Sequence, residues 1–128
     1  MRRPSRRDRA WSQYLRAGLA DGTVDVLVSD HTPVDEDAKA LPFAQCEAGA
    51  TGLELLLSLA LKWSQEDGVP LARALATVTS QPAGVLGAAL GPLQGKVGHL
   101  AVGSVADVCV FDPAAMWTVT SSALRSQG

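Results

Sequence analysis

The chain has 128 residues, enough for one modest domain and too few for a complete (β/α)8 barrel of about 250 residues. Hydrophobic residues make up 47% and charged residues 19%, so the composition is globular rather than disordered. No apolar run reaches the roughly 18 residues of a membrane span, and no secretory signal follows the basic start. The two cysteines are far apart and form no CxxC pair, which favours a reducing, cytoplasmic setting without a disulfide framework.

Positive charge is concentrated at the start of the chain. Residues 1–16 carry six arginines and one acidic residue, a net charge of +5, whereas residues 17–128 carry five basic and twelve acidic residues. A basic arm can bind nucleic acid or anionic lipid. No aromatic platform or recognition helix accompanies this arm, so we interpret it as a solvated, irregular segment. Neither nucleic acid nor a membrane is expected as a partner.

The first half of the chain is predicted to contain a helix, a strand and a loop. Residues 11–20 have apolar side chains at helical spacing and end at an Asp-Gly turn pair. Residues 23–29 are β-branched and mostly apolar, like a parallel strand buried on both faces. The strand, which should span about residues 24–29, leads to Asp30 and then to an acidic loop over residues 32–50.

The second half is predicted to begin with helices. Thr51 and Glu54 match a capping box, and the leucine-rich residues 52–66 after it predict a well-buried helix. Pro70 suits the first turn of another helix, and Ser80 suits the cap of a third.

From residue 91 the pattern changes to that of a small β-unit. Glycines separate short apolar runs, of which residues 105–111 are the clearest strand and residues 117–120 a second candidate. Strands at 24–28 and 105–111 have no evident neighbours in the chain. Because unpaired apolar edges template aggregation, we expect the isolated chain to be aggregated, molten or dependent on a partner.

Asp30 is the strongest candidate for chemistry. A carboxylate at the C-terminal end of a buried parallel strand is where (β/α)8 enzymes keep catalytic groups. Such a group can act as a general base and can also bind a metal. The alternative is that Asp30 only caps the loop by accepting backbone N–H bonds, and the residues alone slightly favour this alternative.

The two histidines do not complete a metal site around Asp30. His31 adjoins it, but consecutive residues of a strand point to opposite faces. His99 lies in a glycine-rich segment without acidic or cysteine neighbours, as expected for a surface histidine. A zinc centre requires several ligands, so the chain is not expected to contain a complete metal site.

Two weaker patterns leave their alternatives open. The acidic residues 35–37 could bind a cation, although they lack the spacing of an EF-hand and fit solvated charge better. Residues 49–52, at a helix start, could cradle an anion through free N–H groups or simply begin the helix.

Four stretches resemble, in order, segments of dihydroorotases, which are members of the cyclic amidohydrolase family. The last barrel strand of that family ends in a motif that reads roughly D-H-A-P-H. The stretches are Val28-Ser-Asp-His-Thr-Pro33, similar to that strand end; residues 41–43 with 49–54, similar to the substrate-side loop and the next helix; residues 79–83 with 86–87, similar to an "NPA..LG" helix; and residues 98–103 with 106–107 and 111–112, similar to the signature of the small β-domain.

The resemblance implies an α/β fold made of two incomplete parts. Residues 1–90 would be the C-terminal segment of a metal-dependent hydrolase (β/α)8 barrel, with the last strand and the following helices. Residues 91–128 would be part of the small β-sandwich domain. We therefore expect a partial sequence, without the earlier barrel strands that carry the HxH pair, the bridging lysine and the remaining histidines.

The resemblance also implies an activity, which is zinc-dependent, reversible ring closure of carbamoyl-aspartate to dihydroorotate in pyrimidine synthesis. Asp30 matches the catalytic and metal-binding aspartate. Pro42, Phe43, Gly49 and Gly52 fall in the loop whose backbone touches the substrate. This chain by itself is expected to be inactive and to bind no zinc tightly, because the remaining ligands are missing.

Val34 departs from the family pattern, which has a substrate-binding histidine four residues past the aspartate. Valine can neither donate a hydrogen bond nor carry charge. In this respect the chain most resembles non-catalytic dihydroorotase-like subunits of some bacteria, which partner the aspartate transcarbamoylase catalytic subunit and support its assembly. A dihydroorotase, such a scaffold, and an independent small binding domain that folds alone therefore remain as alternatives.

Overall fold

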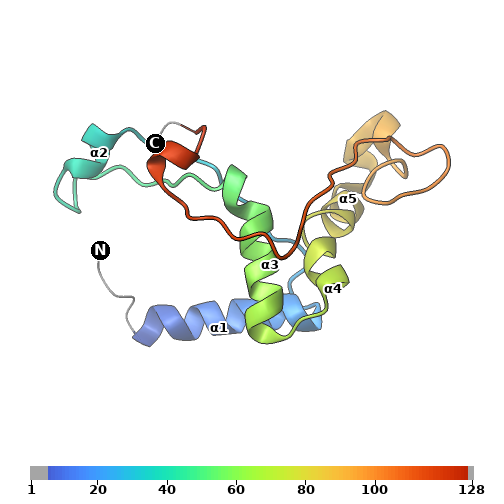
Figure 1. The fold of residues 1–128 in the computed structure, drawn as a ribbon, viewed down its shortest axis with the longest axis horizontal. Helices are drawn as coiled ribbons and strands as arrows, with labels where there is room; N and C mark the ends of the chain where they lie inside the picture. The colour runs from blue at the N-terminus through green and yellow to red at the C-terminus, as the bar shows by residue number, and fades with distance from the viewer. Residues whose placement is uncertain (1–5, 127–128) are drawn as a thin grey trace.

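The fold is known from a computed structural model that describes residues 6–126, and the regular elements of that range are all helices (Figure 1). Helix α1 lies along the base, α3 and α4 rise from it, and two arms diverge above them. One arm holds α2 and η3, and the other holds α5 and η2. In chain order the α-helices and 3₁₀ helices (η) are α1 (Arg6–Asp21), α2 (Glu36–Ala40), η1 (Leu53–Leu55), α3 (Leu56–Asp67), α4 (Leu71–Ala76), α5 (Ser80–Leu86), η2 (Gly87–Leu93) and η3 (Ser121–Ala123).

Helix α1 is longer than predicted. It begins at Arg6 rather than at residue 11, so this part of the basic arm is helical and not irregular. Arginine is a good helix former, which accounts for the extension. The predicted turn after the helix is confirmed: Gly22 has φ 91, and its N–H donates to the carbonyl of Gly18 at 3.1 Å. Residues 1–5 of the arm lie outside the described residues.

The predicted leucine-rich helix over residues 52–66 is confirmed as η1 followed by α3. Its predicted burial is wrong for most of its length, because Ala60, Trp63 and Ser64 are buried whereas Leu53 and Leu59 are exposed. The helix starts with a 3₁₀ turn whose N-cap is Gly52, so the predicted capping box does not form its start. Gly68 ends α3 with a left-handed φ of 65, a conformation that glycine adopts without strain. The Ser64 hydroxyl then donates to the carbonyl of Val69 at 2.7 Å and fixes the turn into α4.

The two shorter helices predicted after it are confirmed as α4 and α5. Pro70 is the N-cap of α4, one residue before the predicted position in the first turn. Ser80 is the first residue of α5, whose N-cap is Thr79. The helix ends at Gly87, with φ 46. The loop between α1 and η1 holds one further helix, α2, which was not predicted.

The strands predicted at residues 24–29, 105–111 and 117–120 are wrong for this structure, since no strand forms among residues 6–126. A strand requires a hydrogen-bonded neighbour. Residues 24–29 instead lie against helices, where the Leu27 N–H donates to the carbonyl of Thr77 at 3.0 Å. The barrel and sandwich content of the expected α/β fold is thus not seen in the described range, and the division at residues 90 and 91 stays a prediction.

The core lies where α1, α3 and α4 meet. Leu19 of α1, Trp63 of α3 and Ala74 of α4 are all buried there. Thr77 is completely buried beside them, and its hydroxyl donates to the carbonyl of Ala74 at 2.7 Å. Burial of a large apolar side chain contributes about 1.5–3 kcal/mol, so the large side chains of this cluster help to hold the three helices together.

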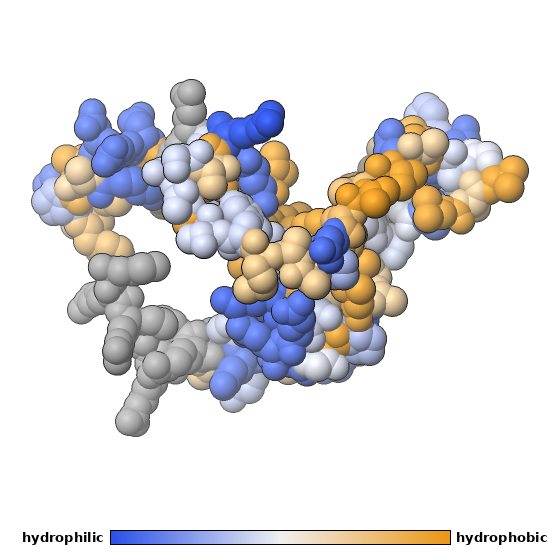
Figure 2. All heavy atoms as spheres, in the orientation of Figure 1, coloured by the Kyte–Doolittle hydropathy of each residue, from blue (hydrophilic) through white to orange (hydrophobic). Residues whose placement is uncertain are grey.

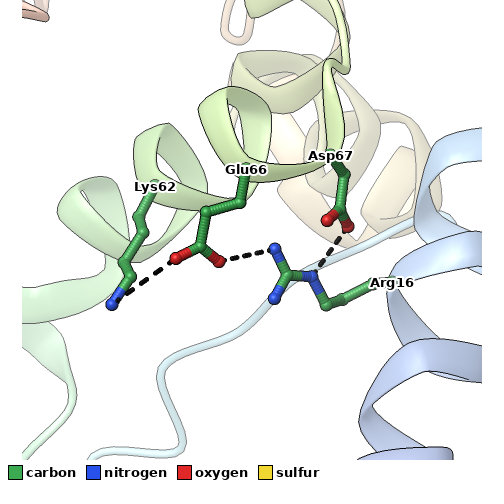
Figure 3. A network of polar contacts seen from close by, with 4 residues as sticks. All are labelled: Arg16, Lys62, Glu66 and Asp67. Atoms are coloured by element: carbon green, nitrogen blue, oxygen red, sulfur yellow. Dashed lines mark hydrogen bonds and ion pairs between the residues drawn. The ribbon is translucent and has the colours of Figure 1, made fainter.

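A charged contact joins α1 to α3 at the edge of this core (Figure 3). The Arg16 guanidinium donates from Nη2 to Glu66 Oε2 at 2.8 Å and from Nε to Asp67 Oδ2 at 2.7 Å. These bonds, led by the one to Glu66, raise the pKa of Arg16. Lys62 Nζ lies 3.8 Å from the other oxygen of Glu66. These two charge-assisted bonds, to neighbouring carboxylates of α3, hold α1 against that helix.

A second arginine joins α4 to the end of α1. Arg73 donates from Nε and Nη2 to the carbonyl of Leu19, at 3.1 and 2.8 Å. The last carbonyls of a helix have no partner within the helix, and a cation there also interacts favourably with the negative end of the helix dipole. Arg73 therefore both satisfies the end of α1 and holds α4 beside it.

Much apolar surface stays exposed away from this junction. Figure 2 shows hydrophobic residues along the arm that holds α5, η2 and the segment returning from them. An open groove of about 800 Å³ lies there, lined mainly by apolar side chains of α3, α4 and α5 and of residues 97–111. Leu100, Val102 and Val110 are among the exposed large side chains of this segment. None of the described helices is long and apolar enough to cross a lipid bilayer.

We predict that the isolated chain self-associates and binds a hydrophobic dye. Each large apolar side chain left in water forgoes about 1.5–3 kcal/mol, against a typical net stability of about 5–15 kcal/mol. Replacing Leu100, Val102 and Val110 together by aspartate should reduce self-association in sedimentation velocity, because these side chains are exposed in the starting structure. A wild-type monomer with a cooperative thermal transition would contradict the prediction.

Candidate functional site

The backbone takes a left-handed conformation at Asp30, here called the Asp30 turn, where the segment after α1 enters the loop. The φ of Asp30 is 42, which makes it the one non-glycine residue with positive φ in the described part of the chain. A left-handed backbone costs an L-residue roughly 1–2 kcal/mol, less for aspartate, and it persists where neighbouring contacts impose it. The side chain is exposed. The turn thus presents a carboxylate to solvent at the position where the sequence predicted one.

His31 joins this turn to the start of the leucine-rich helix. Its Nδ1 accepts hydrogen bonds from the backbone N–H groups of Gly52 and Leu53, both at 3.2 Å. An imidazole nitrogen has a single lone pair, so the two N–H groups share it. On the other side of the ring, Nε2 lies 3.4 Å from the Ser126 hydroxyl. His31 is therefore occupied by structural contacts on both nitrogens.

The turn and the start of η1 approach each other so closely that only glycine fits. A Cβ atom added to Gly52 would collide with the carbonyl oxygen of Ser29. Gly49 has φ 140, and a Cβ there would lie 2.5 Å from the carbonyl oxygen of Thr32. The Thr32 N–H also donates to the carbonyl of Ala50 at 3.0 Å. Gly49 and Gly52 are thus brought beside Asp30, as their predicted shared site requires.

Pro42 and Phe43 are placed differently from the two glycines. The Pro42 carbonyl accepts the N–H of Gln45 at 2.7 Å, which closes a turn. The Phe43 side chain is 99% exposed, so no neighbour fixes its position. Lys39 closes the loop by donating from Nζ to the carbonyl of Gly49 at 2.7 Å. The structure therefore orders the end of the loop near Asp30 and leaves the predicted contact residue Phe43 in solvent.

The C-terminal segment folds back onto the same place. Both carboxylate oxygens of Glu54 accept the backbone N–H of Arg125, at 3.1 and 3.0 Å, and Oε2 also accepts that of Ser126 at 2.9 Å. These bonds, led by the one from Ser126, lower the pKa of Glu54. Figure 1 shows η3 at the upper end of α3, beside the loop. Three segments distant in sequence therefore meet at the start of this helix.

The described residues do not fit a zinc ion. No group of three or more histidine, cysteine, aspartate or glutamate side chains is suitably clustered within the described part of the chain. Asp30 offers one carboxylate, while both nitrogens of His31 already have partners. The ring nitrogens of His99 lie 3.1 Å from the Val97 carbonyl and 3.0 Å from the Ser104 hydroxyl. The metal-binding role of Asp30 stays a prediction.

The two weaker sequence patterns have structural accounts. Glu36 and Asp37 form the first turn of α2, where negative charge is favourable at the positive end of the helix dipole. The N–H groups of Gly52 and Leu53, which could have cradled an anion, donate to His31 instead. Neither pattern therefore defines a ligand site by its geometry.

Similar proteins are found along nearly the whole chain. It is 39% identical to a dihydroorotase of Trichlorobacter lovleyi over 113 residues, 88% of this chain and 25% of the relative. It is 37% identical to a dihydroorotase of Citrifermentans bemidjiense over 124 residues, 97% of this chain and 28% of the relative. A protein of Pseudomonas aeruginosa named dihydroorotase-like is 39% identical over 110 residues, 86% of this chain and 24% of the relative.

The similarity supports a relationship of this chain to the dihydroorotase family. Dihydroorotase relatives imply an amidohydrolase fold. The chain spans about a quarter of the length of the curated relatives that it matches. No family model matches the chain. No solved structure matches it either.

The sequence assigns Asp30, Gly49 and Gly52 to one site, which stays a prediction, and it gives no sign of the contacts that hold these residues. His31 was expected to point away from Asp30, and its bonds to the start of η1 were not foreseen. Glu54 was assigned to a helix cap, whereas it binds residues 71 and 72 positions further along. No local spacing could reveal that contact, because it joins residues that only the folded path of the chain brings together.

We predict that the C-terminal segment detaches from α3 in acid. The pKa of Glu54 lies below its usual value near 4.5, so the contact is fully present above that pH and is lost as the pH falls through the lowered pKa. Amide exchange at Arg125 and Ser126, corrected for intrinsic rates, should show protection at about pH 6 and little at about pH 2. Glu54→Ala should remove the protection at both pH values.

Glu36→Ala is the matched control for Glu54→Ala. Glu36 is an exposed glutamate in the first turn of α2 and makes no bond to the C-terminal segment. Its replacement should leave exchange at Arg125 and Ser126 unchanged. Equal protection in the Glu54→Ala variant and the wild type would contradict the role given to Glu54.

Proposed function

We propose that this chain is part of a dihydroorotase-like cyclic amidohydrolase of pyrimidine biosynthesis. In that enzyme, residues 1–90 would supply the end of a (β/α)8 barrel and residues 91–128 part of a small β-sandwich domain. The observation that carries the proposal is the 37–39% identity to proteins named dihydroorotase over 88–97% of the chain. Residues 24–29, extended and apolar, would gain their strand partners from the rest of the enzyme.

Asp30 would serve as the proton-transferring group of the reaction. Hydrolysis of dihydroorotate adds water to the ring amide carbonyl and breaks the C–N bond, which yields carbamoyl-aspartate. A carboxylate can accept the proton of the attacking water and return it to the departing nitrogen. The exposed Asp30 side chain, on a turn fixed by neighbouring contacts, suits this role. Gly49 and Gly52, which let the loop pack closely against residues 29–32, would shape the substrate side of the site, with Pro42 and Phe43 on the loop beside it.

The chain by itself would be inactive, and any zinc would need ligands beyond the described residues. Cys46 and Cys109 are both free, which suits a reducing, cytoplasmic setting. The substrates of the complete enzyme would be dihydroorotate and carbamoyl-aspartate. The rest of the active site would come from other segments of the enzyme.

A chimera tests this proposal. The aligned segment of the Trichlorobacter lovleyi dihydroorotase is replaced by this chain, and dihydroorotate hydrolysis and its reverse are assayed. The chimera should turn over, whereas the 128-residue chain alone should not. Asp30→Asn should lower kcat about a hundredfold to ten-thousandfold, because it removes the proton acceptor and preserves the shape.

Asp25→Asn is the control for Asp30→Asn. Asp25 is an exposed aspartate five residues earlier on the same extended segment. Its replacement should leave kcat within a few fold of the parent chimera. A folded chimera without turnover, or one in which both substitutions act alike, would count against the proposed function.

A second candidate is a non-catalytic scaffold for the aspartate transcarbamoylase catalytic subunit. The observation that favours it is Val34, which stands where the family resemblance expects a substrate-binding histidine. Its side chain is only 9% exposed and packs toward Gly49, so it is built into the loop rather than offered to a ligand. The Pseudomonas aeruginosa relative, named dihydroorotase-like, adds weight to this reading.

Val34→His separates the two candidates. If Val34 has cost the protein its substrate contact, the variant chimera should gain about tenfold or more in kcat/KM, the worth of a hydrogen bond to a charged group. The unaltered chain should then co-elute with the aspartate transcarbamoylase catalytic subunit. Val85→His, at an exposed position of α5, should change neither result. Full activity with Val34 and no co-elution would remove the scaffold candidate.

A further inference from the structure

We propose that His31 is a positioning residue that fixes the turn at Asp30. By accepting the N–H groups of Gly52 and Leu53, the imidazole ties the residue after Asp30 to the start of the leucine-rich helix. The inference rests on the proposed function only for what the Asp30 carboxylate does. The geometry of the tie stands without it.

Asp30 is held from both sides along the chain. Before it, Ser29 lies against Gly52 so closely that no side chain fits between them. After it, His31 bonds to the same stretch of backbone. A left-handed conformation at a non-glycine residue relaxes when its neighbours release it. The two contacts therefore hold the backbone on both sides of Asp30.

The ring of His31 is itself fixed, which a positioning residue requires. When Nδ1 accepts two N–H groups, the ring proton of the neutral imidazole resides on Nε2. Nε2 is 3.4 Å from the Ser126 hydroxyl oxygen, which can accept a long hydrogen bond from the Nε2–H group. The Ser126 backbone in turn is held by Glu54 at 2.9 Å. The C-terminal segment thus contacts the His31 ring on the side opposite to the leucine-rich helix.

The contacts of His31 differ from those of the other histidine. His99 contacts the Val97 carbonyl and the Ser104 hydroxyl, which are both close to it in sequence. His31 contacts residues 21, 22 and 95 positions away. A contact between residues so far apart in sequence joins separate segments, whereas a contact between residues two to five positions apart shapes one loop. His99 is therefore a matched control.

Hydrogen exchange tests the tie directly. Exchange at Gly52 and Leu53 is measured in the 128-residue chain and in the dihydroorotase chimera, for His31→Leu and His31→Asn. Leucine lacks an acceptor, so both amides should exchange about fivefold faster or more, the loss of one hydrogen bond. Asparagine places its Oδ1 near the position of Nδ1 and should restore most of the protection. His99→Leu and His99→Asn should have no effect.

Kinetics in the chimera tests the consequence for Asp30. His31→Leu should lower kcat about tenfold to a hundredfold, the usual cost of a misplaced catalytic group, with KM nearly unchanged. His31→Asn should recover most of the loss, which a purely structural role would not produce. An inactive parent chimera would defeat the proposed function, and the exchange data would still decide the tie. The inference is overturned if exchange at Gly52 and Leu53 is the same in the wild type and His31→Leu, or if asparagine fails to restore it.

Discussion

The junction of α1, α3 and α4 is the constraint on which the rest of this structure depends. Its apolar part is a few side chains around Trp63, and its polar part is a pair of arginines. Arg16 fixes the direction of α1 against α3, and Arg73 satisfies the end of α1 from α4. Arg16 binds two carboxylates, one of which also pairs with Lys62, and Arg73 binds a carbonyl at the end of α1. The molecule is therefore organised by one small centre, and its longer segments depend on ties of their own.

Those ties are mostly made between side chains and backbone. His31, Lys39 and Glu54 each hold a backbone group from a different stretch of chain, in a region without a regular sheet. Bonds of this kind can be formed by one residue at a time, whereas a strand ladder needs two aligned segments. They fix the loop ends near Asp30 while the middle of the loop stays in solvent. A fixed turn beside a free loop is a usual arrangement where a protein must hold a reactive group and admit a ligand.

The sequence predicted those features that depend on neighbouring residues. The helix over residues 52–66 follows from a local apolar pattern, and the start of a loop after Asp30 follows from the polar residues after an apolar run. Pairing could not be predicted, because the pattern at residues 24–29 shows that the segment is extended and apolar but not what lies beside it. The bonds of His31 and Glu54 join residues 21 to 95 positions apart, so they depend on the folded path of the chain.

The three tryptophans lie in different parts of the molecule, so the fluorescence of each can report on a different part. Trp63 is buried in the helical junction, and Trp11 is exposed on α1. Trp117 belongs to the returning C-terminal segment and donates from its indole nitrogen to the Ser58 hydroxyl of α3 at 3.1 Å. An indole in an apolar setting emits at shorter wavelength than one in water. The emission of single-tryptophan variants would therefore report separately on the junction of the three helices, on α1 and on the contact of the C-terminal segment with α3.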